Sequence, residues 1–325
     1  MVESGITFHE ALRVLEGTGQ GRGAALARGI NDCLYRGFSL SAAFYHFRDR
    51  ISEVCPALVE AGEQSGGLTR TLNIAADWAE LSADLRAKMK SAMIYPAFVL
   101  IVNLLLAGVM LAYVFPTFLP LFQGESLPLL TRFFLGLSWL ATSKLFWLVA
   151  LLGAAEGVAF FSQPEHKEKL YRVAVLVPVL GPLLRSAARC RFCSVLSVTT
   201  RTGLPLMKAM TLAARASGDP QFRDLDVPLQ REVREGVEPH EHFLTHSEVY
   251  GPILSHGMAL CQATGRTDKV CAHLSTLFAA ETETRVRDFQ SLLEPLLIGL
   301  VSMTTGLLLL SIYWPLGKFL QTLVA

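Results

Sequence analysis

The sequence predicts an all-α, polytopic membrane protein with two helical domains on the cytoplasmic side and three membrane-spanning helices. Three observations lead to this fold class. The 325 residues are 51% hydrophobic and only 18% charged, whereas a soluble domain carries about 25% charged residues. Long apolar runs interrupt the polar sequence. Two stretches that lie 199 residues apart also repeat the same landmarks, and a fixed period of this kind indicates a duplicated unit.

The duplication places the same residue types at the same spacing in both copies. Each copy ends in an apolar run of about 20 residues, the length that crosses a bilayer. The sequence therefore predicts that a helical module followed by a membrane span occurs twice. The matching residues are Gly37, Phe44, Gly66, Pro96 and Pro116 in the first copy and Gly236, Phe243, Gly265, Pro295 and Pro315 in the second.

The first polar segment, residues 1–93, has the periodicity of helices. Ile6, Leu12 and Leu15 share one face of an opening helix, and residues 24–47 continue as helix with a break at Gly37. Glycines 66 and 67 then precede a long amphipathic helix that leads toward the membrane. No alternating β-branched run competes with this interpretation.

The second polar segment, residues 185–291, repeats the plan with one addition. Thr202–Leu204 corresponds to Ser4–Ile6, but a further helical stretch, Arg189–Arg201, has only Met1–Glu3 as its counterpart. We therefore expect the first domain to lack its opening helix. The N-terminus also lacks the apolar core of a signal peptide, so the first domain is expected to begin in the cytoplasm.

Three apolar segments are the predicted membrane spans: residues 94–116, 145–161 and 292–314. The second is short and contains Glu156. Pro96 and Pro295 are predicted to open their spans, where the missing N–H costs little, and Pro116 and Pro315 to close them.

Basic residues set the predicted orientation. Residues 1–93 hold 10 Lys and Arg and residues 162–291 hold 16, so 26 of the 29 lie in these two segments. By the positive-inside rule both face the cytoplasm, including the juxtamembrane segment 162–184. The loop 117–144 and the tail 315–325 are predicted on the opposite side.

Several chemistries are not supported by the sequence. No phosphate-binding G-x-x-x-x-G-K-[ST] loop and no G-x-S-x-G nucleophile motif occurs, so no enzymatic activity is predicted. The net charge of +1 gives no basic surplus for nucleic acid. No metal and no cofactor is predicted.

Cysteine and histidine patterns leave two open alternatives. The six cysteines are interpreted as reduced thiols, and Cys190 with Cys193 forms either a metal or redox pair or, as we favour, two small buried residues one helical turn apart. His240, His242 and His246 form either metal ligands or a solvated, acid-flanked turn, and we favour the turn because only His242 and His246 share a helix face.

Ordered motifs resemble the type II secretion system F domain over essentially the whole chain. The second copy departs from the family pattern, because Gln262 takes the position of Glu63 and Arg266 and Thr267 replace small or apolar residues. The motifs are A-G-E-Q-S-G-G-L (Ala61–Leu68), Y-P (Tyr95–Pro96) and F-P-T-F (Phe115–Phe118) in the first copy, V-P-V-L-G-P (Val177–Pro182) in the bridge, and A-T-G-R (Ala263–Arg266), E-P-L-L (Glu294–Leu297) and W-P-L (Trp314–Leu316) in the second copy.

The resemblance implies two cytoplasmic domains of the six-helix-bundle type and a place in the bacterial inner membrane, so that loop 117–144 and tail 315–325 would be periplasmic. It implies a platform protein of type IV pilus assembly or type II secretion. Its partners would be a hexameric cytoplasmic assembly ATPase, pilin or pseudopilin subunits, other inner-membrane assembly proteins, the lipid bilayer and further copies of itself. The motifs do not choose between pilus and secretion system.

The first candidates for partner binding are Glu63 and Gly66 in the first copy, together with Gly265, the counterpart of Gly66 in the second copy. One interpretation is a carboxylate available to a basic surface of the ATPase or to a cation. The other is an N-terminal capping arrangement, in which Glu63 and Ser65 accept backbone N–H bonds and glycine supplies the turn.

Glu156 and Glu294 are the second pair of candidates, because a charge in a membrane span costs at least about 2.5 kcal/mol and marks a functional hypothesis. Either acid could receive the positively charged N-terminus of a pilin, or Glu294 faces water at the cytoplasmic side. A competing function, a small transporter that uses these acids as ion sites, is disfavoured because three spans build no pathway in a monomer. A third, an intramembrane enzyme, lacks a paired catalytic constellation.

Overall fold

The computed structural model describes residues 6–18, 21–48, 50–52, 54–110, 113, 117, 136, 164–178 and 180–324. The predicted second span, residues 145–161 with Glu156, lies outside them, as does nearly all of the predicted loop 117–144. The described residues form helices and no strand, as the sequence predicts.

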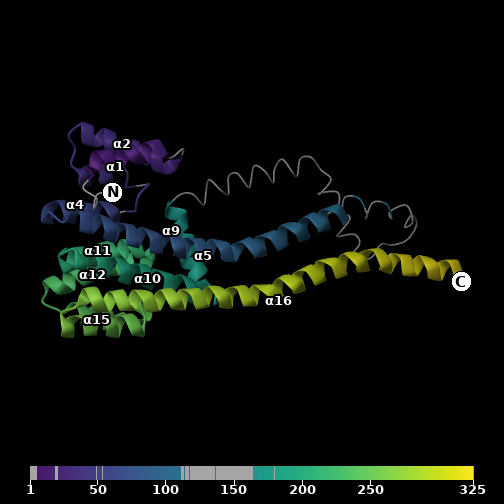
Figure 1. Ribbon diagram of the computed structural model, residues 1–325. Helices are drawn as coiled ribbons and strands as arrows, with labels where there is room; N and C mark the ends of the chain where they lie inside the picture. The colour runs from purple at the N-terminus through teal and green to yellow at the C-terminus, as the bar shows by residue number, and fades with distance from the viewer. Residues whose placement is uncertain are drawn as a thin grey trace. The chain divides into compact units, whose positions relative to one another are not determined.

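Figure 1 shows the helices, whose labels are used from here on. They are α1 (Phe8–Thr18), α2 (Arg22–Tyr35), α3 (Leu40–His46), α4 (Val54–Ser65), α5 (Leu68–Val109), α9 (Pro164–Leu176), α10 (Leu180–Arg201), α11 (Leu206–Ser217), α12 (Pro220–Arg234), α13 (Pro239–Thr245), α14 (Ser247–Tyr250), α15 (Pro252–Thr264) and α16 (Thr267–Val324).

The duplication is visible in the helix boundaries. Helix α3 and helix α13 begin and end at positions 199 residues apart, as do the ends of α4 and α15 and the starts of α5 and α16. The repeated glycines explain part of this register. Gly37 and Gly236 have φ of 86° and 93°, in the left-handed region where only glycine is unstrained. The internal repeat predicted from sequence is therefore confirmed.

Two compact units make up the chain. The first comprises Met1–Ala87 with Val175–Arg285, and the second comprises Lys88–Ala174 with Val286–Ala325. In the first unit the main core joins both copies, since Val54, Leu58 and Trp78 belong to the same cluster of buried side chains as the second copy. Its centre is aromatic: Phe192, Phe222, Phe243 and Tyr250 lie with ring centroids 4.3–6.4 Å apart.

Helix α10 precedes the repeated helices of the second copy. In the second copy α10 packs along α11, and Ala213 and Ala214 of α11 are 0% and 4% exposed. At the positions of α1 that correspond to these two alanines, Leu15 is 48% exposed and Glu16 is half-buried.

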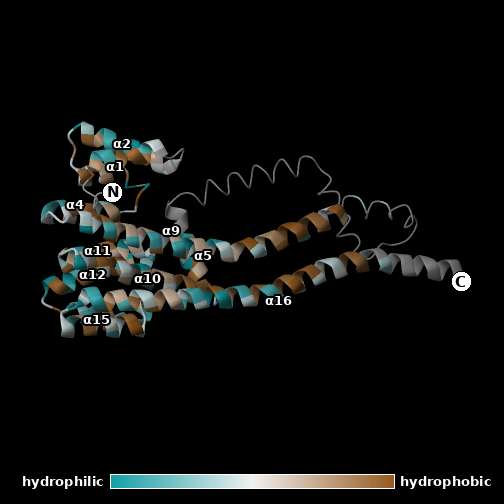
Figure 2. Ribbon diagram, viewed as in Figure 1, coloured by the Kyte–Doolittle hydropathy of each residue, from teal (hydrophilic) through white to brown (hydrophobic). Residues whose placement is uncertain are grey.

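In the second unit, helices α5 and α16 carry the apolar segments. They are the two described helices that are long and apolar enough to cross a membrane, and Figure 2 colours the C-terminal half of α5 and the middle of α16 mainly as hydrophobic. Their apolar side chains are exposed, for example Leu104 at 72% and Met303 at 64%. A core helix of a soluble protein would bury such residues, so a lipid environment explains them better.

Three prolines of the predicted spans, Pro96, Pro295 and Pro315, lie inside helices, so the expectation that they begin or end membrane helices is wrong, while Pro116 lies outside the described residues and the span bounds stay a prediction. Pro96 lies inside α5, and Pro295 lies inside α16, which continues through Pro315 to Val324. Each helix runs without a break from its polar segment into its apolar one. Proline inside an apolar helix is tolerated because neighbouring helices and local adjustments satisfy the freed carbonyl.

Candidate functional site

Glu63 binds the N-terminus of helix α3, which precedes it in the chain by 23 residues. Its Oε1 accepts the backbone N–H of Leu40 at 2.7 Å, and its Oε2 accepts the backbone N–H of Ser41 at 3.3 Å and the Ser41 hydroxyl at 2.5 Å. The Ser39 side chain caps the next donor, the N–H of Ala42. A carboxylate at this position satisfies two amides that a helix leaves without partners and stabilises the helix dipole.

This geometry supports the capping interpretation but changes the helix that is capped. The sequence placed Glu63 at the start of the following helix, whereas the carboxylate bridges α4 to α3. The Ser65 side chain lies outside the described residues. Glu63 itself is exposed, so a contact with a partner stays a prediction.

The second copy uses the same positions with different chemistry. Gln262, the counterpart of Glu63, lies with its Oε1 at 2.8 Å from Nδ1 of His240, the counterpart of Ser41. The contact between these two positions is therefore repeated at the 199-residue offset. Its members change from carboxylate and hydroxyl to amide and imidazole.

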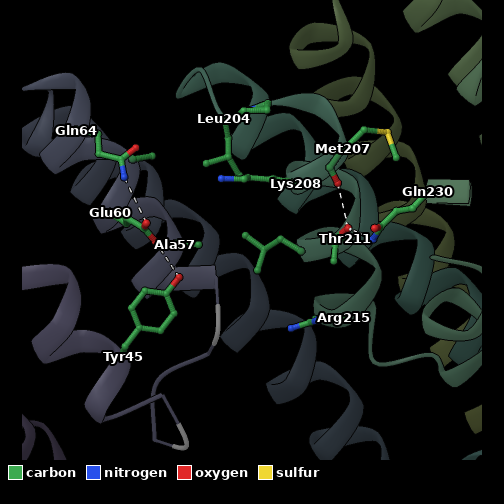
Figure 3. A pocket seen from close by; sticks show the side chains of 13 residues that line it. Tyr45, Ala57, Glu60, Gln64, Leu204, Met207, Lys208, Thr211, Arg215 and Gln230 are labelled. Carbon is green, nitrogen blue, oxygen red and sulfur yellow. Dashed lines mark hydrogen bonds between the residues drawn. The ribbon is translucent and has the colours of Figure 1, made fainter. Parts of the chain in front are cut away.

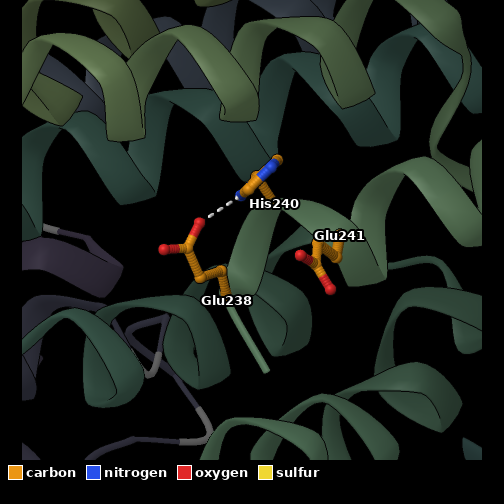
Figure 4. Close-up of side chains that lie close together, drawn as sticks. All are labelled: Glu238, His240 and Glu241. Atoms are coloured by element: carbon orange, nitrogen blue, oxygen red, sulfur yellow. Dashed lines mark ion pairs between the residues drawn. The ribbon is translucent and has the colours of Figure 1, made fainter. Parts of the chain in front are cut away.

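Three side chains at the start of α13 gather close together in Figure 4: Glu238, His240 and Glu241. Their ligand atoms lie within 4.8 Å of one another, and His240 Nδ1 is 3.3 Å from Glu238 Oε2. The two glutamates are exposed. An exposed acidic cluster of this kind is common without an ion, so it does not by itself define a metal site.

The other two histidines of the run have structural contacts. His242 is 1% exposed and its Nδ1 lies 2.7 Å from Glu232 Oε2, while His246 Nδ1 faces the His242 carbonyl at 3.1 Å. Burial lowers the pKa of His242, and the hydrogen bond to Glu232 opposes this shift. His242 is thus a neutral core residue that donates Nδ1–H to a carboxylate. The predicted solvated turn is therefore half-buried at His240 and fully buried at His242.

Gly66 and Gly265 end α4 and α15 in the left-handed conformation, with φ of 71° and 65°. An added Cβ would meet no atom within 4 Å at either position. Backbone conformation, and not close packing, therefore requires glycine here. This turn directs the chain into the long helices α5 and α16.

The cysteines are thiols, and four of them lie in the core of the second copy. Cys190 and Cys193 are both 0% exposed, which confirms the interpretation of two small buried residues. Burial raises the pKa of the Cys190 thiol to about 11. Sequence inspection missed the approach of Cys261 to Cys271, whose sulfurs lie 3.8 Å apart, because the turn at Gly265 brings these two positions together.

Glu294 lies on α16 and its side chain is exposed. Among the described residues it makes no ion pair within 4.0 Å. Its position agrees equally with a water-facing acid and with a partner contact, and both interpretations stay open. Glu156 lies outside the described residues.

A cleft in the first unit was not predicted from the sequence. It has a volume of about 470 Å³, and Figure 3 shows it between helices α3 and α4 on one side and α11 and α12 on the other. Its polar lining includes Tyr45, Glu60 and Gln64 on the first side and Lys208 and Arg215 on the second. Cross-copy packing creates this cleft, and helical periodicity within either copy carries no signal for it.

Comparison with known proteins matches both copies to one family. Residues 1–116 and 192–315 match the family of the type II secretion system protein F. Over 268 residues the chain is 31% identical to the type IV pilus assembly protein TapC of Aeromonas hydrophila, covering 80% of this chain and 64% of that protein. It is 27% identical over 322 residues to the type II secretion system protein F of Pseudomonas aeruginosa, covering 97% and 79%.

A third relative, the type IV pilus assembly protein PilC of Thermus thermophilus, is 27% identical over 330 residues, covering 99% of this chain and 80% of that protein. The chain thus spans 64–80% of the length of these relatives. The fold and the matched stretches define a duplicated all-α protein whose copies both continue into membrane-capable helices. The chain belongs to the type II secretion system protein F family, which confirms the resemblance found in its motifs.

Proposed function

We propose that this protein is an inner-membrane platform of type IV pilus assembly or type II secretion. In this role it couples a hexameric cytoplasmic assembly ATPase to the insertion of pilin or pseudopilin subunits, and it is not an enzyme. The observation that carries the proposal is the family match over both copies. The names of the relatives, which include pilus assembly and secretion proteins, support the same role.

The proposal includes a topology. The helical domains 1–93 and 185–291 face the cytoplasm, the spans are residues 94–116, 145–161 and 292–314, and the C-terminus lies in the periplasm. The two apolar helices and the distribution of basic residues support this arrangement. Alkaline phosphatase fused after Ala325 is expected to be active, and phosphatase fused within residues 185–291 inactive. The reverse pattern would overturn the topology.

Deletion of the gene tests the platform role directly. Surface filaments and secreted proteins are both measured, because the relatives belong to both systems. We expect loss of one of them and recovery when the chain is supplied in trans. After gentle cross-linking, the detergent-solubilised protein is expected to retain the assembly ATPase or a pilin. Normal filaments together with normal secretion in the deletion strain would refute the platform role.

The membrane acids receive a separate test. We propose that Glu156 and Glu294 meet the positively charged N-terminus of an incoming pilin or pseudopilin, since a single acid in an apolar environment attracts a cation strongly. Replacement of either acid by glutamine removes the charge and preserves the shape. If both variants reach wild-type membrane levels and support normal assembly, this role of the acids is refuted.

A further inference from the structure

The cleft between α4 and α11 has the size and the lining of a binding site. Its volume of about 470 Å³ lies in the range of ligand-binding clefts, about 300–1,000 Å³. Leu204, Met207 and Leu212 give it an apolar surface beside its polar groups. Figure 3 shows the side chains of Lys208 and Arg215 extending from α11 into the space that faces α4.

The two cations of the cleft are not neutralised by the described residues around them. Lys208 and Arg215 are both exposed, and neither makes an ion pair within 4.0 Å in the described part of the chain. The carboxylate of Glu60 on the opposite side accepts hydrogen bonds from the Tyr45 hydroxyl at 3.1 Å and from Gln64 Nε2 at 3.3 Å. Two cations therefore face one carboxylate that already has donors.

The duplication provides an internal comparison that separates the requirements of the fold from those of this cleft. The backbone plan is the same in both copies, yet the polar residues of the cleft are not repeated. The fold therefore does not require them. Tyr45, Glu60 and Gln64 have Leu244, Ala259 and Ala263 as counterparts at the 199-residue offset, and Lys208 and Arg215 have Glu10 and Gly17 in the alignment that pairs Thr202–Leu204 with Ser4–Ile6.

We propose that this cleft binds an acidic, aliphatic helical segment of a cytoplasmic assembly partner, with two carboxylates of the segment on Lys208 and Arg215. The proposal rests on the platform function, which supplies such a partner. The cations lie seven residues apart on α11, so their Cα atoms are about 10 Å apart along one helix face. A partner helix with two acids seven residues apart matches this distance and turns the aliphatic residues between them toward Leu204, Met207 and Leu212.

Each ion pair in the expected interaction is weak, so binding depends on Lys208 and Arg215 acting together. A single exposed ion pair contributes about 0–1 kcal/mol, so neither cation alone accounts for specific binding. Two cations beside an apolar surface give a salt-sensitive site, because screening at about 0.1 M salt already acts over about 10 Å.

The experiment uses the full chain in nanodiscs of zwitterionic lipid and a fluorescein-labelled helical peptide. The peptide has about 15 residues, enough for an alanine-based helix, with two glutamates seven residues apart and two leucines between them. Fluorescence anisotropy measures its Kd. We expect the double variant Lys208→Glu/Arg215→Glu to raise the Kd at least about 10-fold, which corresponds to about 1.4 kcal/mol.

A matched control keeps the change in net charge the same. Arg234 and Lys269 are exposed and lie outside the cleft lining, and Arg234→Glu/Lys269→Glu is expected to leave the Kd within about twofold. The milder variant Lys208→Gln/Arg215→Gln should weaken binding to an intermediate degree and guards against misfolding. A peptide with lysines in place of the glutamates should bind the unaltered protein at least about 10-fold more weakly.

Three results would overturn the proposal: an unchanged Kd in the cleft double variant, an equal loss in the control, or equal binding of the lysine peptide. These results differ from failure of the platform function. If gene deletion abolishes assembly while the cleft variant binds the peptide normally, only the cleft assignment fails. If deletion leaves filaments and secretion intact while the cleft variant loses peptide binding, the platform function fails and the acidic-segment site remains.

Discussion

Removal of the Glu63 side chain should destabilise helix α3 by a measurable amount. The carboxylate accepts the N–H groups of Leu40 and Ser41, and loss of a helix cap costs about 1 kcal/mol. Loss of a negative charge at a helix N-terminus adds about 0.3–1 kcal/mol at an exposed position. We therefore expect Glu63→Ala to lower the free energy of unfolding by about 1.5 kcal/mol. Glu63→Gln keeps one acceptor oxygen and should cost about half as much.

Thermal unfolding of the detergent-solubilised protein, followed by circular dichroism, measures this effect. For a folded unit of about 200 residues, 1.5 kcal/mol corresponds to a Tm decrease of about 3–6 °C. Hydrogen exchange should accelerate by about 10-fold at the amides of Leu40 and Ser41 and much less in α13. Glu80→Ala on α5 is the control, because Glu80 is exposed and surface replacements usually change stability by less than about 0.5 kcal/mol. Equal Tm values for the Glu63 and Glu80 variants would refute the capping role.

Three further predictions concern other parts of the molecule. The Thr304 hydroxyl donates a hydrogen bond to Asn103 Oδ1 at 3.0 Å. A double-mutant cycle of Asn103→Leu and Thr304→Val should therefore give a coupling free energy of about 0.6–1.7 kcal/mol when unfolding is followed by SDS titration. A coupling free energy of zero would contradict the contact. Burial lowers the pKa of His242 from its ordinary value of 6.5, so the unfolded chain binds this proton more tightly and stability is lost as the pH falls below about 6.5. Between pH 7.5 and 5.5, the His242→Asn variant should lose less free energy of unfolding, measured with urea, than the unaltered protein. An equal loss in both proteins would refute the linkage between His242 protonation and stability. Maleimide should label the half-buried Cys33 at least about 10-fold faster than the fully buried Cys193, because burial raises the pKa of the Cys193 thiol. Mass spectrometry measures both labelling rates, and similar rates would contradict the burial of Cys193.

The sequence predicted the repeated architecture well because its signals are local. Glycine at Gly37, Gly66 and their counterparts is required by a positive φ, and this requirement is independent of what packs nearby. The helix starts at Leu68 and Thr267 follow directly from these turns. Apolar runs of bilayer length are equally local, so the two described membrane-capable helices were predictable.

Contacts between helices were harder to predict from the sequence. The bond from Glu63 to the start of α3 joins residues 22 and 23 positions apart, and composition gave no reason to choose α3 over α5. A signal did exist, because the pairs Ser41–Glu63 and His240–Gln262 change together at the same offset. The path of α16 through Pro315 was missed for another reason: the cost of proline in a helix, about 3 kcal/mol in water, is smaller where an apolar environment enforces helical hydrogen bonding.

The exchange of Glu63 for Gln262 has a local structural explanation that the cleft lacks. Glu63 is needed at α3 because Leu40 presents an N–H there. The counterpart of Leu40 is Pro239, which has no N–H to cap, and Glu238 and Glu241 already place negative charge around α13. A carboxylate at position 262 would have one backbone N–H donor fewer than Glu63 has, and Glu238 and Glu241 would repel it. A neutral amide that is hydrogen-bonded to His240 is therefore more favourable at this position. No comparable backbone change accompanies the replacement of Ala259 and Ala263 by Glu60 and Gln64 in the cleft. The difference at Glu63 therefore follows from the fold, whereas the differences at the cleft are the ones that the proposed acidic partner segment would explain.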